Sequence, residues 1–310
     1  MILSRLQDWA GRFLFPWDDP GSRLFGLNLL ASVLLVVFFL FSKGERGERL
    51  GREIWKTVFS KRYWWNHSTK EDYLLYLLNA GLKLFLVFPF VRLSFWTSTK
   101  ILGLLSRNFS SPLDIAPGFF ALLLFSAAGF AFDDFLRFAH HWLMHKVPVL
   151  WRLHQVHHSA HVLTPFTLFR LHPLESAMAV LRNSFSSGVS LGCFLFFFRS
   201  ADPSVSALAG TAGFGMLFNF LGANFRHSHI ALSFGWLENV FISPAQHQLH
   251  HARSRNGVNL GVSLAVWDGL FGSLERFRPG AKLRFGLARE INSRKPNSTV
   301  DLPVLVPEVS

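Results

Sequence analysis

Histidines gather in the second half of this chain of 310 residues, and their spacing is that of metal ligands. Thirteen of the fourteen lie between His140 and His251. Eight form one HxxxH and two HxxHH motifs: His141 and His145; His154, His157 and His158; His247, His250 and His251. Positions i, i+3 and i+4 share one face of a helix, so we expect each motif to aim its imidazoles at one point. Eight imidazoles are too many for one metal ion and suit two.

The surrounding sequence limits the chemistry that these histidines support. Neutral imidazole binds iron, zinc, copper and nickel. A zinc hydrolase usually carries HExxH or a carboxylate base, and no carboxylate lies within the motifs. A metal transporter places acids inside its spans, whereas the apolar segments here are nearly free of them. An all-histidine, two-metal site beside a membrane indicates redox chemistry with dioxygen, which zinc cannot perform because it has no redox states.

The elements expected to position the histidines are membrane helices and the segments between them. Half of the residues are hydrophobic, 35 are Phe and only 16% are charged. Residues 24–42 form an uncharged run as long as a membrane span. Further spans are expected at 73–95 and 116–132, and a helical hairpin over 177–221. A buried core helix is the alternative for each segment, above all for the hairpin.

The distribution of the net charge of +12 predicts the topology. Residues 43–70 hold eight Lys or Arg, against three before the first apolar run. By the positive-inside rule this segment is cytoplasmic, which puts residues 96–115 outside and the three histidine motifs on the cytoplasmic side. The basic residues flank apolar spans and form no aromatic-interleaved stripe, so nucleic acid is not an expected partner.

The N-terminal residues and the cysteine content narrow the choice further. Residues 1–20 carry five charges and no long apolar core, so we expect no signal peptide and a retained first span. Cys193 is the single cysteine, which excludes an intramolecular disulfide, a thiolate metal site and a Cys-ligated iron–sulfur cluster. No G-x-G-x-x-G opens a βαβ unit, so no Rossmann-type nucleotide site is expected.

Residues 134–277 resemble the fatty acid hydroxylase/sterol desaturase superfamily of integral-membrane di-iron enzymes. The resemblance covers roughly half of the chain and rests on both the order and the spacing of its motifs. These are Asp134 seven residues before the HxxxH, then LHQVHHS at 153–159, RLHPLE at 170–175, RHSH at 226–229, SPAQHQLHH at 243–251 and WDGLFGS at 267–273.

The resemblance implies a set of site residues. The eight motif histidines become metal ligands, and His227 and His229 are candidates for further ligands, His227 being the better match. His172 and Asp134 would support the ligands. Asp134 lies two helical turns from His141 on the same face, where its carboxylate can accept the imidazole N–H; a helix cap or interfacial charge is the alternative. Of the pattern that follows the last motif in relatives, Asn259 and Gly261 persist, but the acid and the aromatic do not.

The sequence therefore predicts an all-α membrane protein with about three to five transmembrane or re-entrant helices and a cytosolic helical cap that holds a His-rich dimetal site. We expect membrane helices and a basic loop over 1–135, the histidine domain over 136–278 and a cytosolic tail over 279–310. The expected activity is dioxygen-dependent hydroxylation or desaturation of a lipid by two iron ions, with zinc able to replace iron during purification. A non-catalytic membrane metal-binding or sensor protein is the alternative.

The expected partners are a membrane lipid and an external electron donor of ferredoxin or cytochrome b5 type with its reductase. The expected location is a bacterial inner membrane or the endoplasmic reticulum. The sequence leaves open which lipid is used, whether it is hydroxylated or desaturated, which donor acts, and the oligomeric state.

Overall fold

The computed structural model describes residues 26–42, 45–109, 118–198, 214, 223–255, 257–278 and 283–287. The regular secondary structure of these residues is helical, apart from one isolated β-bridge between Phe241 and Leu264. The longer helices are α2 (Gly26–Ser42), α3 (Glu45–Val58), α5 (His67–Asn108), α6 (Phe119–Lys146), α7 (Pro148–His158), α8 (Pro173–Phe197) and α11 (Pro244–His251). The short ones are α4 (Lys61–Trp64), α12 (Val266–Phe271) and three 3-10 turns, η1 (Pro165–Phe169), η2 (Ala223–Phe225) and η3 (Gly235–Asn239). The all-helical expectation is confirmed.

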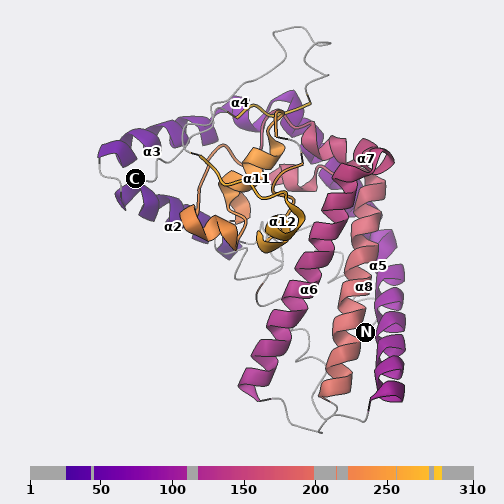
Figure 1. Ribbon diagram of the computed structural model, residues 1–310. Coiled ribbons are helices and arrows are strands. Elements are labelled where there is room, and N and C mark those ends of the chain that lie inside the picture. Colours follow the sequence, from indigo (N-terminus) through magenta and orange to yellow (C-terminus); the bar gives the residue numbers. More distant parts are fainter. Residues whose placement is uncertain are drawn as a thin grey trace.

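Helices α5, α6 and α8 run side by side away from a cap of shorter helices (Figure 1). α5 and α8 approach closely because two glycines, Gly188 and Gly192, one turn apart on α8, face α5. A Cβ at Gly188 would lie 2.5 Å from the Thr97 Cβ, and one at Gly192 would lie 2.7 Å from the Ser98 carbonyl oxygen. Small residues at such spacing let two helices pack with their backbones nearly touching, as is common in membranes.

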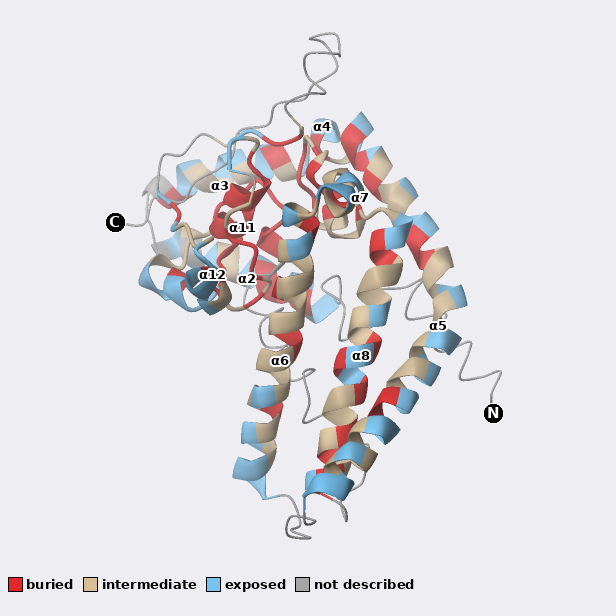
Figure 2. Cartoon of the chain, turned by 45° about the vertical axis from the view of Figure 1, so that its right-hand side comes forward, coloured by how far each residue is buried: buried red, intermediate tan, exposed pale blue. Residues whose placement is uncertain are grey.

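Two of these helices are long and apolar enough to cross a membrane: His67–Asn108 and Phe119–Lys146. Their outer faces are apolar and exposed: Phe85 on α5 and Phe120 on α6 are each 81% exposed. Blue exposed stretches also run along the lower halves of both helices (Figure 2). Hydrocarbon, rather than water, is the solvent that suits such faces.

Helix α2, which covers most of the first expected span, lies with α3 beside the cap (Figure 1). Its buried residues Asn28 and Ser32 face the histidine domain. Asn224 Nδ2 contacts the Asn28 carbonyl oxygen at 3.4 Å and Ser32 Oγ at 3.2 Å. The number of three to five spans therefore stays an expectation.

Residues 96–108 of the segment expected as an external loop form helix instead, because α5 continues to Asn108; the external location of this segment stays a prediction. Thr97 and Ser98 are buried against the α8 glycines, and this packing carries the helix past the end of the apolar run. The first limb of the expected hairpin is α8, which begins at Pro173. The second limb, 204–221, lies outside the described residues apart from Phe214, as does the tail over 279–310 apart from 283–287. Within that tail, Phe285 is buried against Ala160 and Leu163 of the cap.

Candidate metal centre

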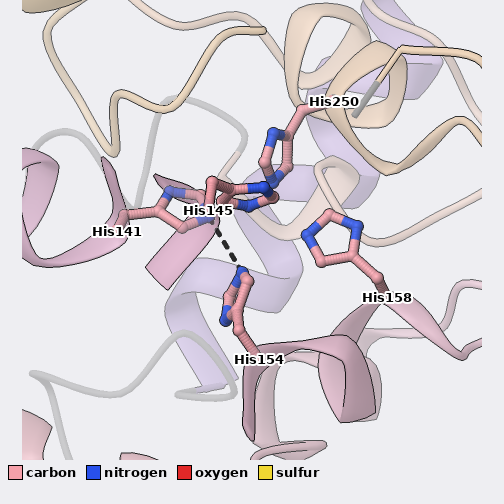
Figure 3. Close-up of side chains that lie close together, drawn as sticks. All are labelled: His141, His145, His154, His158 and His250. Atoms are coloured by element: carbon pink, nitrogen blue, oxygen red, sulfur yellow. Dashed lines mark hydrogen bonds between the residues drawn. The ribbon is translucent and has the colours of Figure 1, made fainter. Parts of the chain in front are cut away.

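Nine histidines converge in the cap in two groups. The first holds five, His141, His145, His154, His158 and His250 (Figure 3). The second holds four, His157, His227, His247 and His251. Within each group, one ring nitrogen per residue lies within 4.8 Å of all the others. The expected dimetal histidine set therefore assembles, and His227 joins the eight motif histidines.

Each HxxHH motif is divided between the two groups, so the expectation that each motif aims at one point is wrong. His154 and His158 on α7 enter the first group while His157 enters the second; on α11, His247 and His251 enter the second while His250 enters the first. Adjacent helical residues point about 100° apart, whereas residues i and i+4 differ by only about 40°. Each helix thus sends an i, i+4 pair to one group and its third imidazole to the other.

The first group presents lone pairs that face each other. His141 Nδ1 lies 2.7 Å from the Leu260 carbonyl oxygen, and His154 Nδ1 lies 2.7 Å from Glu175 Oε1. Because both partners only accept, both Nδ1 atoms carry the proton and both Nε2 atoms are acceptors. These two Nε2 atoms nevertheless lie 3.1 Å apart (dashed line, Figure 3). His250 repeats the pattern, with Nδ1 2.8 Å from the Val258 carbonyl and a buried Nε2 without a hydrogen-bond partner among the described residues. A metal cation bound between these Nε2 atoms would accept their lone pairs and so remove the repulsion between them.

The second group is built alike. His157 Nδ1 lies 3.3 Å from the Arg170 carbonyl oxygen, which turns Nε2 inward. His227 Nε2 lies 3.3 Å from His157 Nε2 and 3.1 Å from His247 Nε2. His251 Nε2 lies 3.2 Å from His247 Nε2. The residues present therefore fit a metal ion in each group.

Burial keeps five of these imidazoles neutral. It lowers the pKa of His157, His158, His247 and His251 well below the ordinary value of 6.5, and neighbouring imidazoles act in the same direction. Burial likewise lowers the pKa of His250 to about 3. Neutral imidazole is the form that binds a metal ion, so the fold holds these ligands ready at neutral pH.

Two supporting residues were not singled out from the sequence. Glu175, in the first turn of α8, is buried and holds His154. Arg170 offers its carbonyl to His157, while its guanidinium bonds the Val156 carbonyl at the end of α7 and Asp72 on α5. Both lie in the RLHPLE segment at 170–175, so the motif was the available signal. Which of its side chains contacts a ligand depends on packing.

The expected contact between Asp134 and His141 is wrong. Asp134 accepts the backbone N–H groups of Ser263 and Leu264, each at 2.9 Å, and Trp267 Nε1 at 3.1 Å. Asp134 thereby anchors the loop that supplies the Leu260 carbonyl to His141. A carboxylate accepts several donors at once, and Asp134 here has three, two from the loop and Trp267 Nε1 from α12, where His141 offers one.

Three other expected site residues have structural contacts instead. His172 is the N-cap of α8, where its Nδ1 accepts the Leu174 N–H at 3.2 Å. His229 lies outside both groups, because its Nε2 accepts the Leu163 N–H at 3.3 Å. Asn259 has a left-handed backbone (φ 50°), and its side chain bonds the Gln246 carbonyl and the Glu275 N–H. Asn259 therefore shapes the loop beside the ligands rather than joining them.

The sequence is similar to those of known proteins. Residues 126–273 match the model of the fatty acid hydroxylase family. Human alkylglycerol monooxygenase is 28% identical over 165 residues, which are 53% of this chain and 33% of that protein. An ornithine lipid hydroxylase of Rhizobium tropici is 26% identical over 149 residues, which are 47% of this chain and 40% of that protein. The match thus spans well under half of each relative. No solved structure matches the chain.

Proposed function

We propose that this chain, whose residues 126–273 match the model of the fatty acid hydroxylase family, is a membrane-bound oxygenase that uses dioxygen to hydroxylate or desaturate a lipid. The observation that carries the proposal is the pair of all-imidazole groups whose inward nitrogens face each other in the cap. Iron is the proposed metal in both, since imidazole suits it and zinc has no redox states.

The nine imidazoles would hold two iron ions, which supply dioxygen activation and the oxidising power to break an unactivated C–H bond. The chain's own residues do the rest. Glu175 and the carbonyls of Leu260, Val258 and Arg170 keep Nδ1 protonated and Nε2 directed inward in four of these imidazoles, His154, His141, His250 and His157. Seven of the nine imidazoles are buried and two, His141 and His145, are half-buried; restricted access of water protects a strong oxidant from side reactions.

A lipid is the proposed substrate because the helices that carry the ligands extend into apolar, exposed faces. His141 and His145 lie at one end of α6, and Phe120 and Leu124, which are 81% and 73% exposed, lie near its other end. A chain lying along α6 would thus reach the first metal group from the bilayer. The names of the relatives favour an ether lipid or an aminolipid among the candidate substrates.

Hydroxylation or desaturation with dioxygen consumes two electrons from outside the substrate, so we propose a protein donor of ferredoxin or cytochrome b5 type with its reductase. Such donors are commonly acidic, and α3 exposes Arg49, Arg52 and Lys56 beside the cap. Opposite charge raises association rates. The competing explanation is that these residues set the topology and contact anionic lipid.

Comparative lipidomics of cells with and without the gene tests the proposal, with a His250→Ala variant as control. A lipid that gains one oxygen indicates hydroxylation, and one that loses two hydrogens indicates desaturation; the variant should match the deletion. Purified protein with iron, lipid and dioxygen should turn over only when donor and reductase are added. An unchanged lipid profile together with a metal-dependent growth defect would favour the non-catalytic sensor instead.

A further inference from the structure

A polar pair lies between α6 and α8 beside the first metal group and has no part in holding the metals. His140 directly precedes the ligand His141 on α6. Arg182 lies on α8, and its Nη1 donates to His140 Nδ1 at 3.0 Å. Its Nη2 donates to Asn183 Oδ1 at 2.8 Å. An arginine is costly between apolar helices, so its presence calls for a partner.

The two side chains present unused hydrogen-bond donors. A guanidinium can only donate, so His140 Nδ1 must accept and the imidazole proton lies on Nε2. His140 Nε2 and Arg182 Nε are both buried and have no hydrogen-bond partner among the described residues. Buried donors without partners are rare because each costs the lost hydration of the group. The site therefore lacks an acceptor.

The charges around Arg182 favour a negatively charged acceptor. The charges near Arg182 are Arg137, Asp133 and Glu175. Asp133 is paired with Arg137 at 2.6 Å, and Glu175 with His154 at 2.7 Å. Among the described residues, no carboxylate makes a direct ion pair with Arg182. A guanidinium removed from water binds a carboxylate or phosphate better than a neutral oxygen.

We propose that Arg182 and His140 bind the anionic headgroup, a phosphate or carboxylate, of the lipid on which the metal centre acts; this rests on the proposed function. Leu181 and Phe185, 55% and 46% exposed, flank Arg182 and offer apolar contact for the chain. Arg182 is seven residues from Glu175, or about 10 Å along the helix. The oxidised carbon therefore lies near the headgroup rather than at the far end of the chain.

Lipid binding to the full-length, metal-loaded protein tests the proposal by native mass spectrometry. The probes are phosphatidic acid and a long-chain fatty acid, with diacylglycerol as the neutral probe and inorganic phosphate as competitor. Arg182→Gln should weaken binding of the anionic lipids by about tenfold or more and leave diacylglycerol binding and metal content unchanged. Arg182→Lys, which keeps the charge, should retain part of the affinity. Arg92→Gln, at an exposed arginine on α5, should change nothing.

Unchanged anionic-lipid affinity in Arg182→Gln would overturn the proposal. So would equal loss of diacylglycerol binding, which would indicate a packing defect. Lower metal content with unchanged lipid binding would make Arg182 an internal partner of Glu175 instead. Displacement of the lipids by inorganic phosphate at equal concentration would assign the site to free phosphate. Because the readout is binding, a lipid that binds through Arg182 but is never oxidised would refute the proposed function alone.

Discussion

Glu175 Oε1 lies 2.7 Å from His154 Nδ1, and both side chains are almost completely buried. Three other ligands, His141, His250 and His157, place Nδ1 against a backbone carbonyl instead. A carboxylate makes an imidazole a stronger donor to metal than a neutral carbonyl does. The two histidine groups are therefore unequal as candidate metal positions, because the five-histidine group has one more imidazole and contains His154, whose Nδ1 contacts a carboxylate.

Replacing Glu175 with Gln should lower metal affinity at the five-histidine group by about 10–100-fold, because the amide keeps the shape but not the charge. Metal content after graded chelator dialysis measures the effect, and one of the two metals should leave earlier than in the wild type. Glu53→Gln, at an exposed glutamate of α3 that pairs with Lys56, is the matched control. If both metals leave as in the wild type, Glu175 does not tune the site.

Single ligand removals should separate the two groups. His250→Ala should cost mainly the metal of the five-histidine group, and His157→Ala that of the four-histidine group. Activity should be abolished in both while the protein still inserts in membranes. His172→Ala should keep both metals and lose only stability, by about 0.5–2 kcal/mol, because His172 caps α8. Loss of metal in His172→Ala, or full activity in either ligand variant, would contradict the assignment.

Acid should destabilise the metal-free protein well above the pH at which carboxylates titrate. Burial lowers the pKa of five ligands, His157, His158, His247, His250 and His251, below 6.5. Below about pH 6.5 the unfolded chain takes up protons that the folded protein does not, so stability falls as pH falls, by at most about 1.4 kcal/mol per histidine per pH unit.

Thermal unfolding followed by tryptophan fluorescence measures this effect between about pH 7 and about pH 5. The metal-loaded protein should be more stable at pH 7 and release metal on acidification, since protons compete for the ligands. A Tm of the metal-free protein that stays constant over this window would show that the buried histidines are not neutral in the folded state.

The histidine groups and the far end of α5 should lie on opposite sides of the membrane. Ser106, near the end of α5, and Lys146, at the end of α6 beside the metal groups, are both exposed. In a Cys193→Ser background, single cysteines at these positions should react with an impermeant reagent from opposite faces, Lys146 from the cytoplasm. Labelling of both from one face would refute this topology.

Local spacing identified most of the candidate metal ligands. Histidines at i, i+3 and i+4 lie within one half of a helix, so the eight motif histidines were readable from the sequence as candidate ligands, although each HxxHH motif divides between the two groups. The long apolar runs likewise predicted the helices that became α5, α6 and α8, although α5 extends past its apolar run because its end packs on the α8 glycines.

Tertiary packing alone decided how those ligands are shared and supported. The five-and-four division depends on how α6, α7 and α11 are turned toward one another. Preference for His227 over His229 depends on which ring reaches the second group and which meets the Leu163 N–H. Glu175 contacts His154, and Asp134 contacts a loop that lies about 130 residues further along the chain. Such contacts join segments far apart in the chain, where the spacing along a single helix carries no information.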